Sequence, residues 1–147
     1  MRAGRRSATT TSVRDGFNRA LAVWRGGWRC DVRAGNFDLV VDEPPGAGGT
    51  GLGPMPTDLL LASLSSCYAL ALAWAARKRG FELPDLEVTA TGTYAGQRFA
   101  SLELTVATSL SADRVMPLLE PARRVCYVSN TLMHTPPITV SLASPRS

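Results

Sequence analysis

The chain combines short amphipathic runs with one long apolar stretch. Near the N-terminus, Phe37, Leu39 and Val41 repeat at every second position, which is the period of a strand with one buried face. Gly26-Gly27 and Gly35-Asn36 interrupt this part of the chain at the spacing of tight hairpin turns. The N-terminal part therefore predicts three short strands. The glycine- and proline-rich segment that follows predicts an irregular loop.

The longest apolar stretch lies between Asp58 and Arg77, where eighteen consecutive residues carry no charge. Pro56 suits a first helical turn, and Gly80 after a run of basic residues suits a helix end. Eighteen residues reach the lower length limit of a membrane-spanning helix. However, three serines dilute the stretch, and amphipathic strand patterns surround it. The pattern therefore favours a buried central helix over 56–80, and no membrane partner is expected.

A second helix is predicted over 111–133, where apolar residues recur at helical spacing. Ser111 is placed to act as its N-cap. Pro117 and Pro121 lie inside the segment, and each removes a backbone donor and crowds the preceding turn. The helix is therefore expected in two pieces.

Two alternating runs, 85–94 and 98–108, predict a hairpin, and residues 138–142 predict a final strand. The predicted element order is β-β-β-α-β-β-α-β, an α+β fold. Its long helix needs cover on both sides, which so small a domain hardly supplies alone, so a homodimer is expected. Residues 1–20 are expected to be a flexible basic extension, and 21–147 a single domain.

The net charge of +4 at pH 7 comes largely from the N-terminus, where eight of the fifteen arginines lie in the first 33 positions. Such a segment can bind nucleic acid or an anionic membrane. It carries neither interleaved aromatic residues nor a nucleic-acid-binding motif, so no nucleic-acid partner is expected. Its composition fits a transit peptide and a disordered extension equally well, and the missing apolar core argues against a secretory signal.

Three cysteines, Cys30, Cys67 and Cys126, are present without a C-x-x-C pair. An odd number at wide spacing is unlike the framework of a secreted disulfide protein, so a reducing, cytoplasmic setting is expected. A lone cysteine in an apolar helix usually serves packing. The predicted helix face that carries Cys67 also carries Leu60, Leu64, Ala71 and Trp74.

Cys126 lies on the apolar stripe of the second predicted helix, so both thiols are expected to point inward. Two inward-facing thiols on packed helices could approach within disulfide distance. That geometry suits a two-cysteine peroxidase, in which a thiolate attacks an O–O bond and a second thiol resolves the sulfenic acid. A zinc site of the three cysteines with His134 has the wrong ligand spacing. A Cys126–His134 nucleophile–base pair lacks an orienting third group.

The segment DEPPGAGGTGLGPMPTDLLLASLSSCYALAL, followed at a distance by ARRVCYVSNTL, resembles the OsmC/Ohr family of organic-hydroperoxide reductases. The similarity runs from about Val23 to Ser141. Three features carry this similarity: the Asp-Glu-Pro start, the Gly-Pro-x-Pro-x-[Asp/Glu]-Leu-Leu helix entry and the two separated cysteines. The resemblance implies an intertwined α+β homodimer with two sites at the subunit interface, with Cys67 as the peroxidatic cysteine and Cys126 as the resolving one.

The resemblance also implies an arginine from the early strands that lowers the pKa of the first thiol, held by an acidic residue at the helix entry. Arg29 is the favoured arginine, with Arg25 as the alternative, and Asp58 is the acid. Nine residues on a helix place Asp58 about 180° from Cys67, so it is expected to act through the arginine. The resemblance further implies organic hydroperoxides as substrates, an external dithiol or lipoyl-type reductant, and no resident cofactor.

Three positions depart from the pattern of the peroxidases in this family. Thr57 stands where the Ohr branch has its acidic residue, and Asp58 follows one position later. Trp28, rather than an arginine, comes directly after the Gly-Gly turn. Tyr127 follows Cys126 where proline is common.

The leading hypothesis is a cytoplasmic, homodimeric, thiol-dependent peroxidase that reduces organic hydroperoxides in oxidative-stress defence. One alternative is a non-catalytic OsmC-like protein that binds a small apolar ligand in the dimer pocket. The other is a protein-interaction module whose thiols only fill the core. Cys30, on an early strand, is expected to serve packing.

Overall fold

The computed structural model describes residues 18–146 of the chain. The predicted N-terminal extension over 1–20 lies outside the described residues except for its last three, and Ala20 already belongs to the first strand. The chain divides into two compact units, Met1–Pro56 and Thr57–Ser147. Each unit is described by itself.

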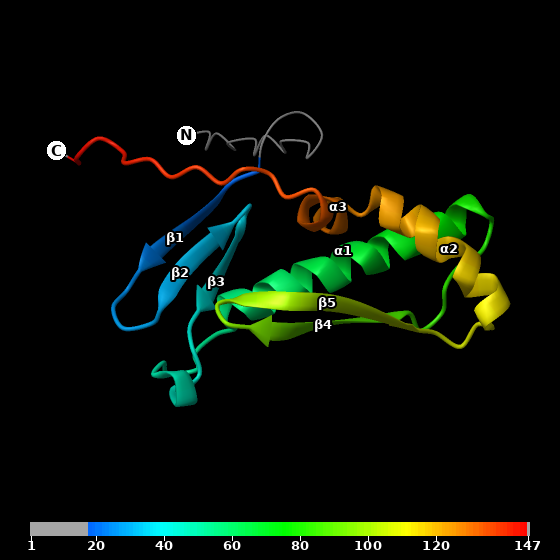
Figure 1. Ribbon diagram of the computed structural model, residues 1–147, viewed down its shortest axis with the longest axis horizontal. Coiled ribbons are helices and arrows are strands. Elements are labelled where there is room, and N and C mark those ends of the chain that lie inside the picture. The colour runs from blue at the N-terminus through cyan, green and yellow to red at the C-terminus, as the bar shows by residue number, and fades with distance from the viewer. Residues whose placement is uncertain (1–17, 147) are drawn as a thin grey trace, which may run out of the picture. The chain divides into compact units, whose positions relative to one another are not determined.

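The first unit contains a three-stranded antiparallel sheet of β1 (Ala20–Trp24), β2 (Cys30–Ala34) and β3 (Phe37–Val41) (Figure 1). Cys30 on the central strand pairs with Trp24 on one side and Val41 on the other. The two turns fall at the predicted glycine-containing positions, because these residues adopt the positive φ that tight turns require. The three predicted strands are confirmed.

The loop after β3 is organised around the side chain of Asp42, which is only 1% exposed. Its carboxylate accepts hydrogen bonds from the backbone N–H groups of Glu43 (2.8 Å) and Leu52 (3.2 Å), and from both the N–H and the hydroxyl of Thr50. The loop packs so closely that a Cβ on Gly53 would lie 2.0 Å from the Val40 carbonyl oxygen. Apart from a short 3-10 turn, η1 (Pro45–Ala47), the segment is irregular as predicted.

The long helix α1 (Pro56–Lys78) carries an acid in its first turn and cations in its last, as its dipole favours. Its buried face comprises Leu64, Tyr68, Ala71, Leu72, Ala75 and Ala76. On the opposite side Leu70 is 72% exposed, and Trp74, predicted to point inward, is exposed as well. The other elements of this unit cover one face of α1 only, so cover of both sides, expected of a homodimer, stays a prediction.

Length and apolar composition alone would allow α1 to cross a membrane, which holds for no other helix within residues 18–146. Core helices of soluble proteins pass the same test. The buried face of α1 packs into a core with α2 and with the β4–β5 hairpin, which is the behaviour of a core helix.

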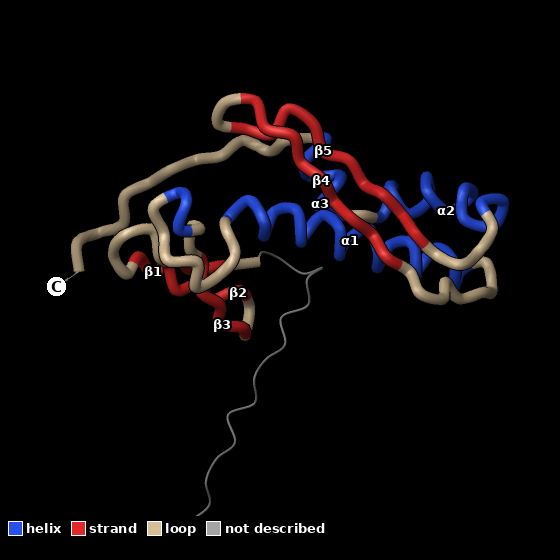
Figure 2. The backbone as a smooth tube through the Cα atoms, turned by 90° about the horizontal axis from the view of Figure 1, so that it is seen from below, coloured by secondary structure: helices blue, strands red, loops and turns tan. Residues whose placement is uncertain are grey.

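The second sheet is a hairpin of β4 (Glu87–Ala95) and β5 (Arg98–Ala107), which run side by side in Figures 1 and 2. Val88 pairs with Val106, and both pack against the α1 core. The register shifts at Thr93/Tyr94, close to the tip. The predicted hairpin is confirmed, but it forms a sheet separate from β1–β3 within the described residues.

Helices α2 (Ala112–Val125) and α3 (Tyr127–Met133) form the second predicted helix in two pieces, as expected. The break is at Cys126, whose backbone is extended, and not at Pro117 or Pro121, which stay inside α2. Each proline removes a single helical hydrogen bond, and the buried side chains of Leu118 and Ala122 hold the helix on the core. Ser111 precedes α2 as predicted, but its hydroxyl makes no capping hydrogen bond.

The predicted final strand over 138–142 is absent from the described chain. A strand is stable only when its backbone groups pair with a neighbour, and no described strand pairs with this segment. Its alternating apolar residues are almost fully exposed: Ile138 91%, Val140 94% and Leu142 100%. This part of the prediction is wrong for the single chain.

Candidate functional site

The structure brings the two predicted redox cysteines together in the second unit. Cys67 lies in the middle of α1, and Cys126 lies at the junction of α2 and α3. Cys67 packs against the buried cluster that contains Cys126, and the Cys126 thiol is close enough to raise the pKa of Cys67. Both thiols are reduced. The third cysteine, Cys30, belongs to β2 in the first unit.

The two thiols differ in exposure, because the α2–α3 junction closes over only one of them. Cys126 is fully buried, whereas Cys67 is partly exposed. Burial raises the pKa of Cys67, and the neighbouring Cys126 raises it further. The backbone N–H groups of Val128 and Tyr127 act in the opposite direction, since they hydrogen-bond to the sulfur. None of the described groups that shift this pKa is a cation, so no positive charge among them opposes the effect of burial.

The backbone donors near Cys67 come from the start of α3. The extended backbone of Cys126 (φ −78°, ψ 104°) ends α2 and redirects the chain, so that the first N–H groups of α3 lie beside Cys67. The first N–H groups of a helix have no partner within the helix. They therefore stabilise a negatively charged sulfur once a proton has been removed.

The predicted arginines lie in the first unit and share a carboxylate that sequence reasoning missed. Arg25 Nε is 2.8 Å from Asp31 Oδ2, and Arg29 Nη2 is 3.1 Å from Asp31 Oδ1. The hydrogen bond from Arg25 contributes most to lowering the pKa of Asp31, and the hydrogen bond from Arg29 adds to it. The Arg29 Nε is buried and has no hydrogen-bond partner among the described residues. Asp31 is the only acid between positions 19 and 37, which is the signal that could have identified it.

Asp58 lies in the first turn of α1 and is exposed. The helix is continuous from there to Cys67, so the two side chains leave it on opposite sides, about 13 Å apart along its axis. The neighbouring Thr57 contacts the hairpin, since its Oγ1 lies 2.9 Å from the hydroxyl of Tyr94 at the tip of β4–β5. The Tyr94 ring stacks on Phe99 at 4.5 Å. Thr57 thus ties the hairpin tip to the helix entry.

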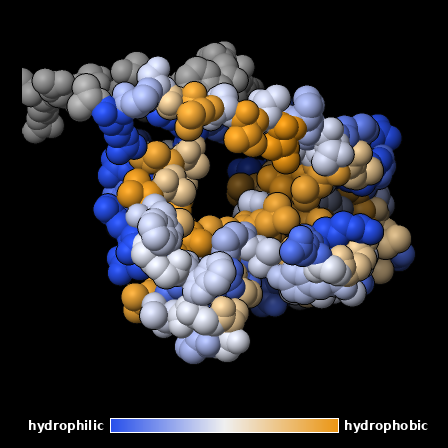
Figure 3. Space-filling view, turned by 60° about the vertical axis from the view of Figure 1, so that its left-hand side comes forward, coloured by the Kyte–Doolittle hydropathy of each residue, from blue (hydrophilic) through white to orange (hydrophobic). Residues whose placement is uncertain are grey.

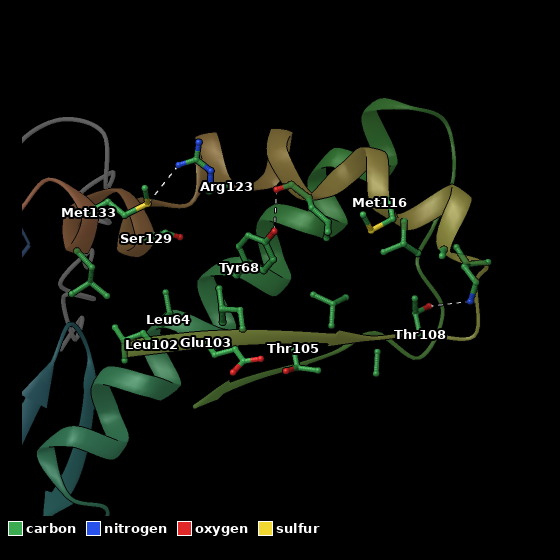
Figure 4. A pocket seen from close by; sticks show the side chains of 18 residues that line it. Leu64, Tyr68, Leu102, Glu103, Thr105, Thr108, Met116, Arg123, Ser129 and Met133 are labelled. Carbon is green, nitrogen blue, oxygen red and sulfur yellow. Dashed lines mark hydrogen bonds between the residues drawn. The ribbon is translucent and has the colours of Figure 1, made fainter. Parts of the chain in front are cut away.

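A cavity of about 770 Å³ opens between β5, α2 and α3 on the same unit (Figure 4). Most of its wall is apolar, including Leu102, Leu104, Val106, Val115, Leu119 and Met133. Leu64 and Tyr68 of α1, which flank Cys67 in sequence, form its floor. The Tyr68 hydroxyl donates a hydrogen bond to the Leu119 carbonyl (2.9 Å), and burial raises the pKa of this tyrosine.

Within residues 18–146, no group of three or more His, Cys, Asp or Glu side chains is arranged to hold a metal ion. His134 lies at the end of α3, with its Nδ1 3.1 Å from the Asn130 carbonyl oxygen. That contact belongs to the helix end.

Comparison with known proteins places the chain among OsmC-like sequences and structures. The sequence profile described as OsmC-like protein matches residues 49–141. An uncharacterized protein of Haloferax volcanii is 27% identical over 110 residues, which cover 72% of this chain and 80% of that protein.

Three solved structures illustrate the likeness of fold. An OsmC-like protein from Mycoplasma pneumoniae has a TM-score of 0.68 and 18% identity, covering 82% of this chain and 90% of its own. The organic hydroperoxide resistance protein OsmC from Legionella pneumophila has a TM-score of 0.61 and 24% identity, covering 80% and 90%. An organic hydroperoxide resistance protein from Elizabethkingia anophelis has a TM-score of 0.63 and 24% identity, covering 84% and 93%. At these identities the likeness establishes an α+β fold of the same kind.

Proposed function

The chain belongs to the OsmC-like protein family, and on that premise we propose that it is a thiol-dependent peroxidase that reduces organic hydroperoxides. The observation that carries the proposal is the pair of neighbouring reduced thiols, one partly exposed and one fully buried. Two structural relatives are organic hydroperoxide resistance proteins, which agrees with this reading. Defence against oxidative stress in the cytoplasm is the proposed setting.

The proposed reaction begins at Cys67, since it is the less buried of the two cysteines. The Cys67 thiolate attacks the terminal peroxide oxygen, the O–O bond breaks, and the alcohol leaves with a proton. The Cys126 thiol then attacks the resulting sulfenic acid, so that a Cys67–Cys126 disulfide forms and water leaves. An external dithiol, of the lipoyl type, restores both thiols by disulfide exchange. The two electrons that reduce the peroxide thus come from that dithiol.

The raised pKa of Cys67 means that a positive charge has to assist the first step. We propose Arg29 for this role, with Arg25 as the alternative, because Asp31 holds both guanidinium groups in place. Asp58 is proposed to act on the arginine from the helix entry. Its position on the far side of α1 from Cys67 argues against a direct contact with the thiol.

A homodimer is the proposed assembly. The exposed face of α1, with Leu70 and Trp74, is unusually apolar for a surface in contact with water, and other apolar side chains are also exposed (Figure 3). Ile138, Val140 and Leu142 alternate as strand residues do but lack a partner strand within the described chain. A second copy is proposed to cover the helix face and to pair with this segment.

The test is peroxide consumption with cumene hydroperoxide and dihydrolipoamide. We expect turnover by the wild type and none by Cys67→Ser. After one equivalent of peroxide without dithiol, the intact mass of the wild type should fall by two hydrogens, and Cys126→Ser should instead retain an added oxygen. Cys30→Ser is the matched control and should behave as the wild type. Equal activity of wild type and Cys67→Ser would rule out the catalytic proposal.

A further inference from the structure

The cavity between β5, α2 and α3 is of the size and composition of a ligand site. Its volume of about 770 Å³ falls within the usual range of small-molecule pockets, which are mostly apolar with a few polar groups. Every described residue that lines it belongs to the second unit. Cys67 and Cys126 are not among the lining residues, so the cavity is distinct from the thiol pair although it shares α1 and α3 with it.

One polar group in the wall has no partner within the described part of the chain. Ser129 of α3 is only 8% exposed, and its hydroxyl oxygen is buried without a hydrogen bond. Figure 4 shows this hydroxyl directed toward the cavity. A buried hydroxyl without a partner costs free energy, and a ligand oxygen inside the cavity would remove that cost.

The charges around the cavity favour a neutral ligand. Arg123 is the only cation among the described lining residues, and Glu120 already occupies two of its nitrogens at 2.9 and 2.8 Å. A third nitrogen of Arg123 contacts the Met133 sulfur at 3.5 Å. The acidic side chain along the wall, Glu103, is exposed, and Figure 4 shows it on the side of β5 away from Tyr68 and Ser129. An anionic head group would therefore find no free cation among the described lining residues.

We propose that this cavity binds a neutral aliphatic molecule with one hydroxyl or carbonyl oxygen, which hydrogen-bonds to Ser129. The aliphatic chain lies against the leucine and valine side chains of β5 and α2. This inference goes beyond the proposed peroxidase, because the ligand needs no O–O bond and the site contains neither thiol.

Calorimetric titration of the full chain with 1-decanol tests the proposal, with decanoate as the charged ligand of equal length. We expect one decanol per chain and binding of decanoate at least about ten-fold weaker, because a buried unpaired carboxylate costs more than the 1.4 kcal/mol that a factor of ten represents. Absence of saturable decanol binding, or equal binding of the two ligands, would overturn the proposal.

Variants identify the site. Ser129→Ala should weaken decanol binding about five-fold, the value of one neutral hydrogen bond, without lowering the Tm of the free protein. Met116→Trp, which enlarges an exposed side chain of the wall, should weaken it further. Ser101→Ala is the matched control, since this serine is exposed on β5 outside the wall. Equal affinities of Ser129→Ala and Ser101→Ala would show that decanol binds elsewhere.

Discussion

At the scale of single residues, the reactivity of Cys67 depends on groups that oppose each other. Burial and the adjacent Cys126 raise its pKa, while two backbone N–H groups of α3 favour the thiolate. A neutral thiol reacts poorly with peroxides, so the proposed arginine has to outweigh the effect of burial. The proposed catalysis therefore requires a cation in addition to the thiol pair.

Replacement of the proposed arginine should change the titration of Cys67. Because a neighbouring cation lowers a thiol pKa, Arg29→Gln should raise the pH midpoint of Cys67 alkylation by about one unit, which corresponds to about 1.4 kcal/mol. Site-resolved alkylation with iodoacetamide across pH 6–10, with each modified peptide measured by mass spectrometry, gives this midpoint. Arg33→Gln, which breaks a surface pair with Asp38 on the same sheet, is the control. An unchanged midpoint in Arg29→Gln would exclude this arginine as the activator.

The carboxylate of Asp42 should control the stability of the glycine-rich loop. The hydrogen bonds that its carboxylate accepts lower the pKa of Asp42, and the bond from the Thr50 hydroxyl contributes most. The stabilisation is present above the unfolded pKa of about 3.9 and is lost as pH falls through the lower folded value. Asp42→Asn should therefore lower the Tm at pH 7, and the difference from wild type should shrink below about pH 4. In thermal unfolding scans Asp38→Asn, at an exposed ion pair, should have little effect.

At the scale of elements, contacts between segments decide features that local propensity does not. The hairpin tip is held by the Tyr94–Phe99 stack and by the Tyr94–Thr57 hydrogen bond. Gly92 lies beneath this stack, and a Cβ there would lie 2.5 Å from the Phe99 ring. Glycine at position 92 therefore leaves room for the Phe99 ring, although glycine weakens a strand.

The effect of replacing Gly92 on stability should depend on whether Phe99 is present. Gly92→Ala should destabilise the protein by about 1 kcal/mol, because it displaces the Phe99 ring from Tyr94. In a Phe99→Ala background the same change should be neutral or stabilising, since alanine is the better strand residue. Urea denaturation of the four proteins in this double-mutant cycle measures the coupling. Additive effects would contradict the proposed packing.

At the scale of the whole molecule, the described chain leaves apolar surface that a monomer in water would be expected to bury. The outer face of α1 and the segment 138–142 are the main examples. Cover of both sides of α1 was predicted only for a homodimer, and residues 138–142 were predicted to form a strand, which the described chain does not form. A second copy would cover both regions, which is why the homodimer is the proposed assembly.

A charge on the outer face of α1 should disrupt that assembly. Leu70→Arg would place an unpaired cation in the proposed interface, whereas Leu70→Met keeps its volume and apolar character. Light scattering after size-exclusion chromatography should show a dimer for wild type and Leu70→Met, and a monomer for Leu70→Arg. Circular dichroism checks that the variant remains folded. A dimeric Leu70→Arg would show that this face is not the interface.

The sequence by itself determined most of the elements and the residues that are proposed to carry the chemistry. Strand and helix periods follow from backbone geometry, so β1–β3, α1 and the hairpin could be predicted, and the family motifs singled out Cys67 and Cys126 as candidates. Only the tertiary structure decided that the second helix breaks at Cys126, that one thiol is buried and the other accessible, that Asp31 holds the arginines, and that a cavity opens beside α3. These features depend on which side chains, far apart in the sequence, come into contact when the elements pack. Periodicity carries no information about such contacts. For the same reason segment 138–142 has the pattern of a strand without forming one: a strand exists only where another strand pairs with it.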